Sequence, residues 1–208
     1  MLPARLTAMN ALEPMRSGRL RDRAGRARAG VAARARGFTL IELMVTIAVA
    51  AILTALAVPA FNTFMENDRL LTQSSALVSA LDLARSEAIK ADTSVSVCPS
   101  TDAMTCSGAS DWSGGYIVLS AAGGPPLQSV GAQPSGVTLN EANNLTAVTF
   151  LSSGLTTLLA SNAPSAQFTM CDGRGAADAR YTEVQVTGRV ASSQTPGQNL
   201  TGGALACP

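Results

Sequence analysis

Residues 38–58 read FTLIELMVTIAVAAILTALAV, a run of 21 residues in which Glu42 carries the only charge. An α-helix rises about 1.5 Å per residue, so this run would span roughly 32 Å, close to the thickness of a bilayer's hydrocarbon core. The apolar region of a secretory signal peptide is shorter, ~7–15 residues, and ends at a small-residue cleavage site. The run therefore predicts a membrane-spanning helix with one carboxylate near its start.

The segment before this run is strongly basic. Residues 1–37 hold nine arginines and two acidic residues, a net charge of +7, whereas residues 38–208 carry a net charge of −6. Basic residues next to a membrane helix favour the cytoplasmic side, so we expect a single-pass membrane protein with residues 93–208 outside the cytoplasm. A nucleic-acid arm is the alternative, but no aromatic residue interleaves these arginines for base stacking.

The carboxylate inside the apolar run needs a partner. A charge at this depth costs at least ~2.5 kcal/mol on insertion scales, and no basic side chain follows Glu42 within the run. Cleavage of the Gly37–Phe38 bond would create an amino group at Phe38, which would supply a cation within the same chain or to a neighbouring one. Residues 37–42 thus favour a cleavage site after Gly37 and a polar contact between the new amino group and Glu42.

The sequence GFTLIE at residues 37–42, followed by an apolar helix, resembles the class III signal of type IV prepilins. The resemblance implies that the prepilin peptidase cleaves after Gly37 and methylates the new amino terminus, Phe38. It also implies that Glu42 takes part in docking each subunit onto a growing fibre. Pro59 resembles the proline that this family places late in the membrane part of the helix, where it would bend the helix without ending it.

Beyond Pro59 the apolar residues continue at helical spacing, which predicts one long helix from Phe38 to about Asp92. The face is formed by Leu70, Leu77, Leu81, Ala84 and Ala88. We therefore divide the chain into a basic leader at 1–37, a membrane and assembly helix at 38–58, an amphipathic continuation at 59–92 and a β-rich domain at 93–208. A leader of 37 residues is longer than is usual in the family, and Met9 or Met15 would serve equally well as its first residue.

From Thr93 onward, short β-prone runs alternate with Gly, Pro, Ser and Asn, which predicts strands joined by turns. A helix laid against a mostly antiparallel sheet is an α+β fold. The helix end LARSEAIKADTSVSVCPS and the run VQVTGRV resemble the domain shared by H-type pseudopilins and FimT/FimU-like minor pilins. The strand candidates are 93–98, 115–119, 136–139, 145–151, 166–171 and 182–190.

All four cysteines fall in the part expected outside the cytoplasm, where an even number favours disulfides. Of the three pairings that four cysteines permit, we expect Cys98 with Cys106, closing a local loop, and Cys171 with Cys207, restraining the carboxy-terminal tail. Zinc is the alternative, but paired CxxC units and histidine are both missing from the sequence. We therefore expect neither a metal nor a cofactor.

The sequence offers little for catalysis. It contains no histidine, which removes the commonest general base, and no GxSxG or P-loop pattern. Its loop carboxylates, such as Asp102, lack EF-hand spacing. We interpret Trp112, the lone tryptophan, as a packing residue. The chain is therefore predicted not to be an enzyme.

Some FimT-like minor pilins bind DNA through basic residues near the carboxy terminus, and Arg174, Arg180 and Arg189 fall in that region here. Nearby acidic residues offset these charges, and the GRxR pattern of DNA-binding members is incomplete at Gly188-Arg189-Val190-Ala191. So few phosphate contacts would give weak, salt-sensitive binding. A membrane-tethered DNA-binding pilin for DNA uptake is therefore an alternative, not the main hypothesis.

The main hypothesis is a minor type IV pilin that takes part in assembly or priming at the fibre tip. Its expected partners are the prepilin peptidase, other minor and major pilins or pseudopilins, and the inner membrane. The resemblance implies a single-pass protein of the inner membrane with its carboxy-terminal domain in the periplasm, before it enters the pilus or pseudopilus. The nearest alternative is an H-type pseudopilin of type II secretion, which would share the anchor, the cleavage and the domain.

Overall fold

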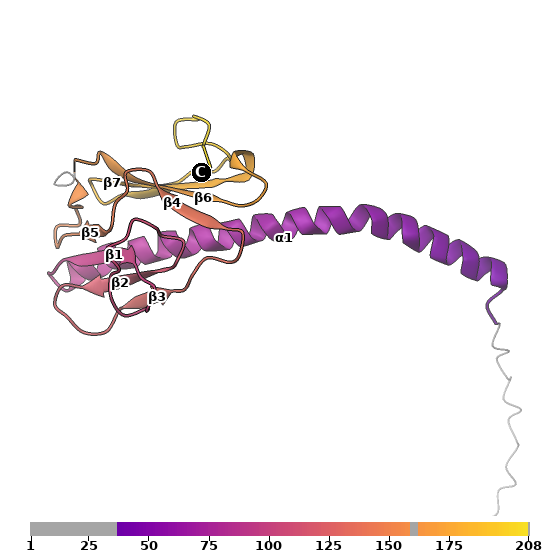
Figure 1. Cartoon of the computed structure of the whole chain (residues 1–208), viewed down its shortest axis with the longest axis horizontal. Helices are drawn as coiled ribbons and strands as arrows, with labels where there is room; N and C mark the ends of the chain where they lie inside the picture. The colour runs from indigo at the N-terminus through magenta and orange to yellow at the C-terminus, as the bar shows by residue number, and fades with distance from the viewer. Residues whose placement is uncertain (1–36, 159–161, 208) are drawn as a thin grey trace, which may run out of the picture. The chain divides into compact units, whose positions relative to one another are not determined.

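The computed structural model describes residues 37–158 and 162–207 (Figure 1). The predicted basic leader, apart from Gly37, lies outside these residues. The long helix α1 spans Leu40–Lys90 and is followed by eight strands and the short 3-10 helix η2 among the described elements. Their bounds are β1 Val95–Pro99, β2 Tyr116–Ser120, β3 Gln128–Val130, β4 Thr138–Glu141, β5 Val148–Phe150, β6 Ser165–Cys171, η2 Ala176–Asp178, β7 Arg180–Gln185 and β8 Val190–Ser192.

Helix α1 confirms the predicted long helix to within two residues at each end. The helix continues through Pro59, whose carbonyl accepts a hydrogen bond from the Thr63 hydroxyl at 3.2 Å. It ends where Asp92 takes a positive φ of 47°, a conformation that halts a helix and that aspartate tolerates better than most residues.

The strands form two antiparallel four-stranded sheets. Sheet A has the order β3-β2-β1-β5 and sheet B the order β4-β6-β7-β8. Together with α1 they confirm the predicted α+β class, a long helix packed on antiparallel sheets. Figure 1 shows the carboxy-terminal part of α1 beside both sheets.

One predicted strand is wrong. Residues 182–190 do not form a single strand, because the chain reverses at Gly188 and returns as β8. Gly188 has φ 75°, and its N–H donates to the Gln185 carbonyl at 2.8 Å. A Cβ at Gly188 would also collide with the Gly154 carbonyl oxygen, so both the turn and its packing require glycine. Alternating valines on both sides of the turn hide the reversal from the sequence pattern.

Strand β3 was not among the predicted strands. It holds only three residues, Gln128–Val130, of which two are polar. It pairs with β2, where Tyr116 lies opposite Val130. A run this short carries no periodicity to recognise.

The core lies between the second half of α1 and the two sheets. Trp112 is fully buried, meets Phe168 edge-on with ring centroids 4.9 Å apart, and donates its indole N–H to the Leu145 carbonyl at 2.9 Å. This is the packing role predicted for Trp112. On the helix side the buried residues are Leu70, Ser74, Leu77, Ala80, Leu81, Ala84 and Ala88.

Candidate functional site

The first candidate site is the start of α1. The Thr39 hydroxyl accepts a hydrogen bond from the Glu42 N–H at 3.2 Å, and the Thr39 carbonyl accepts one from the Leu43 N–H at 3.1 Å. Thr39 is therefore the N-cap, and Glu42 occupies the third helical position, where a carboxylate favours the positive end of the helix. The Gly37–Phe38 bond lies just before the helix, and Phe38 is 74% exposed.

The packing of the described residues does not require a glycine at position 37. Nothing lies within 4 Å of the position that a Cβ on Gly37 would take. Folding therefore supplies no reason for a glycine there, so any requirement must come from a molecule that recognises the segment.

The first half of α1 presents an apolar surface that the described chain does not cover. We call residues 40–66 the unburied half, because every one of them is exposed, and residues 67–90 the packed half. An 18-residue window of α1 reaches a mean hydropathy of 2.4 with none of it buried, which is long and apolar enough to cross a membrane. Within the described residues, the Glu42 carboxylate on this surface has no hydrogen-bond or ion-pair partner.

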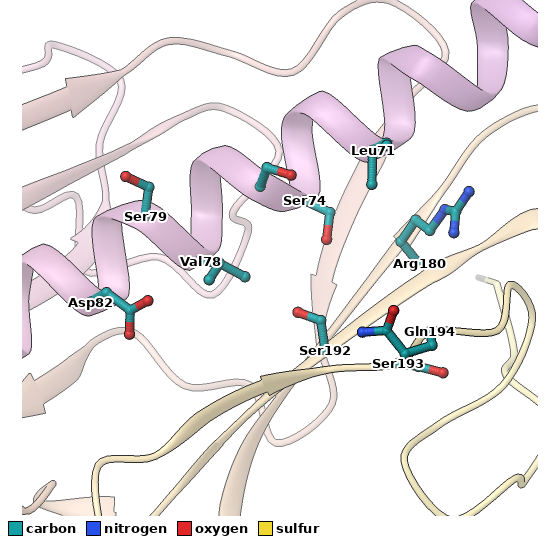
Figure 2. A pocket seen from close by; sticks show the side chains of 10 residues that line it. Leu71, Ser74, Val78, Ser79, Asp82, Arg180, Ser192, Ser193 and Gln194 are labelled. Atoms are coloured by element: carbon teal, nitrogen blue, oxygen red, sulfur yellow. The ribbon is translucent and has the colours of Figure 1, made fainter.

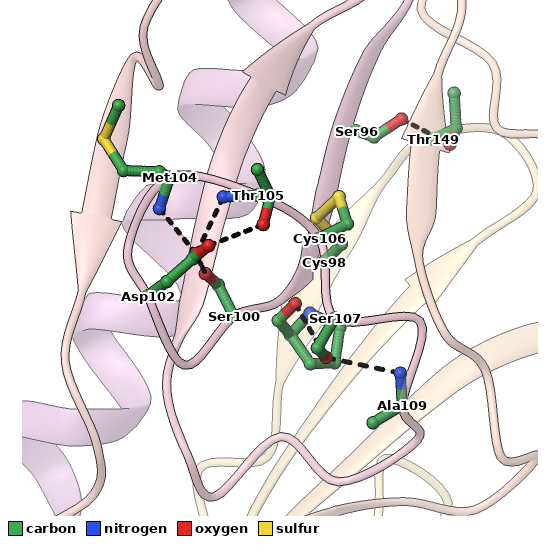
Figure 3. Close-up of a disulfide and its surroundings, with 11 residues drawn as sticks. Ser96, Cys98, Ser100, Asp102, Met104, Thr105, Cys106, Ser107, Ala109 and Thr149 are labelled. Carbon is green, nitrogen blue, oxygen red and sulfur yellow. Dashed lines mark hydrogen bonds between the residues drawn. A yellow bond between two sulfur atoms is a disulfide. The ribbon is translucent and has the colours of Figure 1, made fainter.

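The cysteines lie in the two pairs expected. Cys98 at the end of β1 is bonded to Cys106 in the following loop, with Cα atoms 5.6 Å apart (Figure 3). Cys171 at the end of β6 is bonded to Cys207, with Cα atoms 6.0 Å apart. The second bond fastens the tail to sheet B.

Asp102 organises the loop inside the first disulfide. Its carboxylate accepts hydrogen bonds from the Thr105 hydroxyl and N–H, from the Met104 N–H and from the Ser100 hydroxyl, at 2.6–3.0 Å (Figure 3). These bonds hold the pKa of Asp102 well below its usual range. The carboxylate thus serves the loop itself, and the described residues contain no group of three or more potential metal ligands.

Arg174 is held by acidic neighbours. Its guanidinium lies 2.7 Å from Asp172, 3.2 Å from Glu66 and 3.5 Å from Asp178, and donates to the Asn67 side-chain oxygen at 2.9 Å. Hydrogen bonding to Asp172 raises the pKa of Arg174. This cluster, the Arg174 clamp, joins α1 to the loop after β6, a structural role that the sequence analysis did not assign.

The three arginines considered for DNA contact do not form one basic patch. Arg174 is occupied by its clamp, Arg180 begins β7, and Arg189 is exposed in the turn after β7 ends. A six-residue strand is roughly 20 Å long, so Arg180 and Arg189 lie near opposite ends of the hairpin. This separation gives no concentrated surface for phosphates.

Comparison with known proteins places these features in a family. The family described as type II transport protein GspH matches residues 73–188, which is more than half of the chain, and the prokaryotic N-terminal methylation motif matches residues 32–58. The chain belongs to the GspH family of pilin-like proteins, which confirms the predicted subgroup. A comparison with curated protein sequences found no match.

Solved structures that resemble this chain include a minor pilin and a minor pseudopilin, both at low sequence identity. The type IV minor pilin FimU of Pseudomonas aeruginosa is 22% identical, with 64% of this chain and 98% of that chain covered and a TM-score of 0.48. The minor pseudopilin EpsH of the Vibrio cholerae type II secretion system is 16% identical, with 60% of this chain and 96% of that chain covered and a TM-score of 0.44.

Proposed function

We propose that this chain is a minor subunit of a type IV pilus. It is made as a precursor, cut by the prepilin peptidase between Gly37 and Phe38, methylated at Phe38 and held in the inner membrane until it joins the fibre near the tip. The observation that carries the proposal is the unburied half of α1, an apolar helix that begins directly at a methylation motif. The function is assembly, not catalysis.

The apolar surface needs a cover in both states of the subunit. In the membrane, lipid covers it, and in a fibre the helices of other subunits would do so. Glu42 gives this otherwise non-directional packing one polar contact, which is strengthened where water is excluded. The amino group of Phe38 on a neighbouring subunit is the partner that the cleavage would create.

The test is the mass and amino-terminal sequence of the protein taken from membranes with and without the prepilin peptidase. We expect a chain that starts at methylated Phe38 only when the peptidase is present. A Gly37→Val variant should fold normally, because its side chain meets no described atom, yet it should stay uncut. An uncut wild-type chain, or one cut elsewhere, would refute the proposal.

A type II secretion pseudopilus is the second candidate, because the description of the matching family names type II transport. The two fibres are separated by a deletion strain. Loss of surface pili with normal protein secretion supports the pilus, whereas loss of secretion with normal pili supports the pseudopilus.

A further inference from the structure

A groove of about 540 Å³ lies between the packed half of α1 and the region of β8 (Figure 2). One wall is a stripe of α1, and Figure 2 shows Leu71 and Asp82 near opposite ends of it. The other wall carries Ser192, Ser193 and Gln194, and Arg180 stands near the Leu71 end. The side chains that line it are mainly uncharged hydroxyls and small apolar groups.

Strand β8 is the edge of sheet B, and its outward backbone groups are open. Gln185 N–H donates to the Arg189 carbonyl at 2.9 Å and Ser193 N–H to the Tyr181 carbonyl at 3.0 Å. Because hydrogen-bonded and non-bonded pairs alternate in an antiparallel ladder, the first and last residues of β8 direct their N–H and C=O groups away from β7. No described residue bonds to these outward groups. The groove therefore borders an unpaired strand edge, the feature to which an extended chain adds.

The dimensions suit a short strand. The α1 stripe of Leu71, Ser75, Val78 and Asp82 lines the groove at successive helical turns. It extends about 16 Å along the helix, which equals roughly five residues of extended chain. A strand beside β8 could thus lay alternate side chains over Leu71 and Val78 and expose the rest.

The charges at the groove are unmatched within the described chain. Asp82 and Arg180 have no ion-pair partner there, in contrast to the Arg174 clamp. The Arg180 Nε is moreover buried with no hydrogen-bond partner. A carboxylate arriving from outside would not reach this buried atom, but it could pair with the terminal nitrogens of the Arg180 guanidinium, which have no acceptor among the described residues.

We propose that this groove binds an extended segment of a different fibre subunit, which pairs with the open edge of β8 and places a carboxylate on Arg180. The identity of this partner as a fibre subunit rests on the proposed function. The segment is about five residues long, has small or apolar side chains facing α1, carries Asp or Glu at the Arg180 end and favours a basic residue at the Asp82 end.

Two substitutions at one position isolate the strand edge. Ser192→Pro removes an outward N–H and keeps every β7 ladder bond, since edge strands accept proline where the N–H is unpaired. Ser192→Ala is its control, because both variants lose the hydroxyl contact to Thr182 at 2.9 Å while alanine keeps the N–H. Loss of one net hydrogen bond should reduce partner capture by Ser192→Pro roughly three- to tenfold relative to Ser192→Ala.

Capture is measured with a photoreactive residue at Ser75 in the full-length chain, in cells that make the fibre, with the linked peptide identified by mass spectrometry. The control position is the exposed Ala122 in the β2–β3 loop. We expect a link from Ser75, but not from Ala122, to an acidic extended segment of another pilin-like subunit. Arg180→Gln should weaken the link and Arg189→Gln should not. This second pair tests the proposal if Ser192→Pro proves less stable to heat than Ser192→Ala, so that its loss of capture could reflect unfolding.

The outcomes separate the two proposals. Wild-type protein absent from sheared fibres and from the pseudopilus refutes the proposed function and this inference with it. Wild-type protein present in fibres, but with equal yields from Ser75 and Ala122 or a link only to a second copy of this chain, refutes the inference alone.

Discussion

The two halves of α1 contain similar apolar residues but have opposite surroundings. In the unburied half, Leu53 is 61% exposed and Ile47 60%, whereas in the packed half Leu77 and Leu81 are at most 1% exposed. The unburied half is almost uniformly apolar, with Glu42 and Glu66 as its only charges, whereas the packed half is amphipathic. The packed half is covered by the chain's own sheets, and in our proposal a membrane or other subunits cover the unburied half.

Small residues show how each half could be covered. Ala80, Ala84 and Ala88 are fully buried, which lets the sheets approach the helix backbone closely. The unburied half is also rich in alanine, with Ala48, Ala50, Ala51, Ala55, Ala57 and Ala60. Helices in membranes associate through such small residues, so we expect other subunit helices to pack closely there.

The strongest test of the difference between the two halves is a matched pair of leucine-to-alanine substitutions, one in each half. Leu81→Ala should lower the free energy of unfolding by about 2–5 kcal/mol, because it leaves a cavity in the core. Leu53→Ala removes the same atoms from an exposed position and should leave domain unfolding unchanged. Chemical denaturation of the full-length chain in detergent, followed through the fluorescence of Trp112, measures both. Equal losses would mean that the unburied half packs on the domain.

The two disulfides contribute to the stability of the domain whose sheets cover the packed half. Replacing Cys171 and Cys207 with serine reopens a 36-residue loop, and the chain-entropy relation predicts a loss of about 4 kcal/mol. Replacing Cys98 and Cys106 reopens a separation of only 8 residues and should cost about 2.5 kcal/mol by the same relation. Both variants should remain in the membrane fraction, because the unburied half is intact. The reverse order of stability would contradict the loop-length argument.

In the unburied half the largest effect should appear in assembly. Glu42→Ala would remove the charge-assisted contact proposed between subunits, which is worth about 1.5–3 kcal/mol, so incorporation into fibres should fall roughly ten- to a hundredfold. Domain stability should not change. Thr54→Ala is the control in the same half, since among the described residues the Thr54 hydroxyl bonds only within its own helix, at the Ala50 and Ala51 carbonyls. Quantitative immunoblots measure the ratio of subunit in sheared fibres to subunit in membranes. Normal incorporation of Glu42→Ala would contradict the assembly role of Glu42.

The Arg174 clamp should have a smaller effect. Its side chain is only 18% exposed and meets Glu66 at the boundary between the two halves. Arg174→Gln should destabilise the domain by about 1–2 kcal/mol, because it strands partly buried carboxylates. The exposed Arg189 is the control, and Arg189→Gln should change stability by no more than about 0.5 kcal/mol. Thermal melts of both variants give the comparison.

The smallest expected effect is a pH dependence within the same clamp. Burial alone would raise the pKa of Asp172, but hydrogen bonds and charge from Arg174, with charge from Arg69, prevail and lower it. A lowered pKa means that this stabilisation is complete above the usual value of 3.8 and is lost as the pH falls below it. The acid side of a stability profile should therefore be shallower in Arg174→Gln than in wild type. Identical slopes would contradict the coupling.

The sequence predicted the helix and the fold class because both depend on long, repeated patterns. The apolar run and the spacing of Leu70, Leu77 and Leu81 extend over many turns, so local exceptions do not matter. The reversal at Gly188 escaped prediction because its flanking valines fit one strand or two equally well. The same reasoning explains β3, which is too short for a pattern.

The candidate sites divide in the same way. The segment at Gly37 and Phe38 is contiguous, so its motif could be recognised directly. The Arg174 clamp combines neighbours in the sequence with distant residues. Asn67, for example, lies 107 positions before Arg174. The groove beside β8 depends on which strand forms the sheet edge. Neither could be derived without the tertiary structure, although the nearness of Asp172 and Asp178 to Arg174 in the sequence was a partial signal.

The bond between Cys171 and Cys207 has a consequence for degradation outside the cell. It closes a covalent ring that contains β7, β8 and the tail. A protease that nicks any single peptide bond between these two cysteines therefore releases nothing, and the two pieces stay joined until the disulfide is reduced. A subunit exposed on a fibre would tolerate such damage without shedding its carboxy-terminal strands, and electrophoresis would separate the two pieces of a nicked molecule only under reducing conditions.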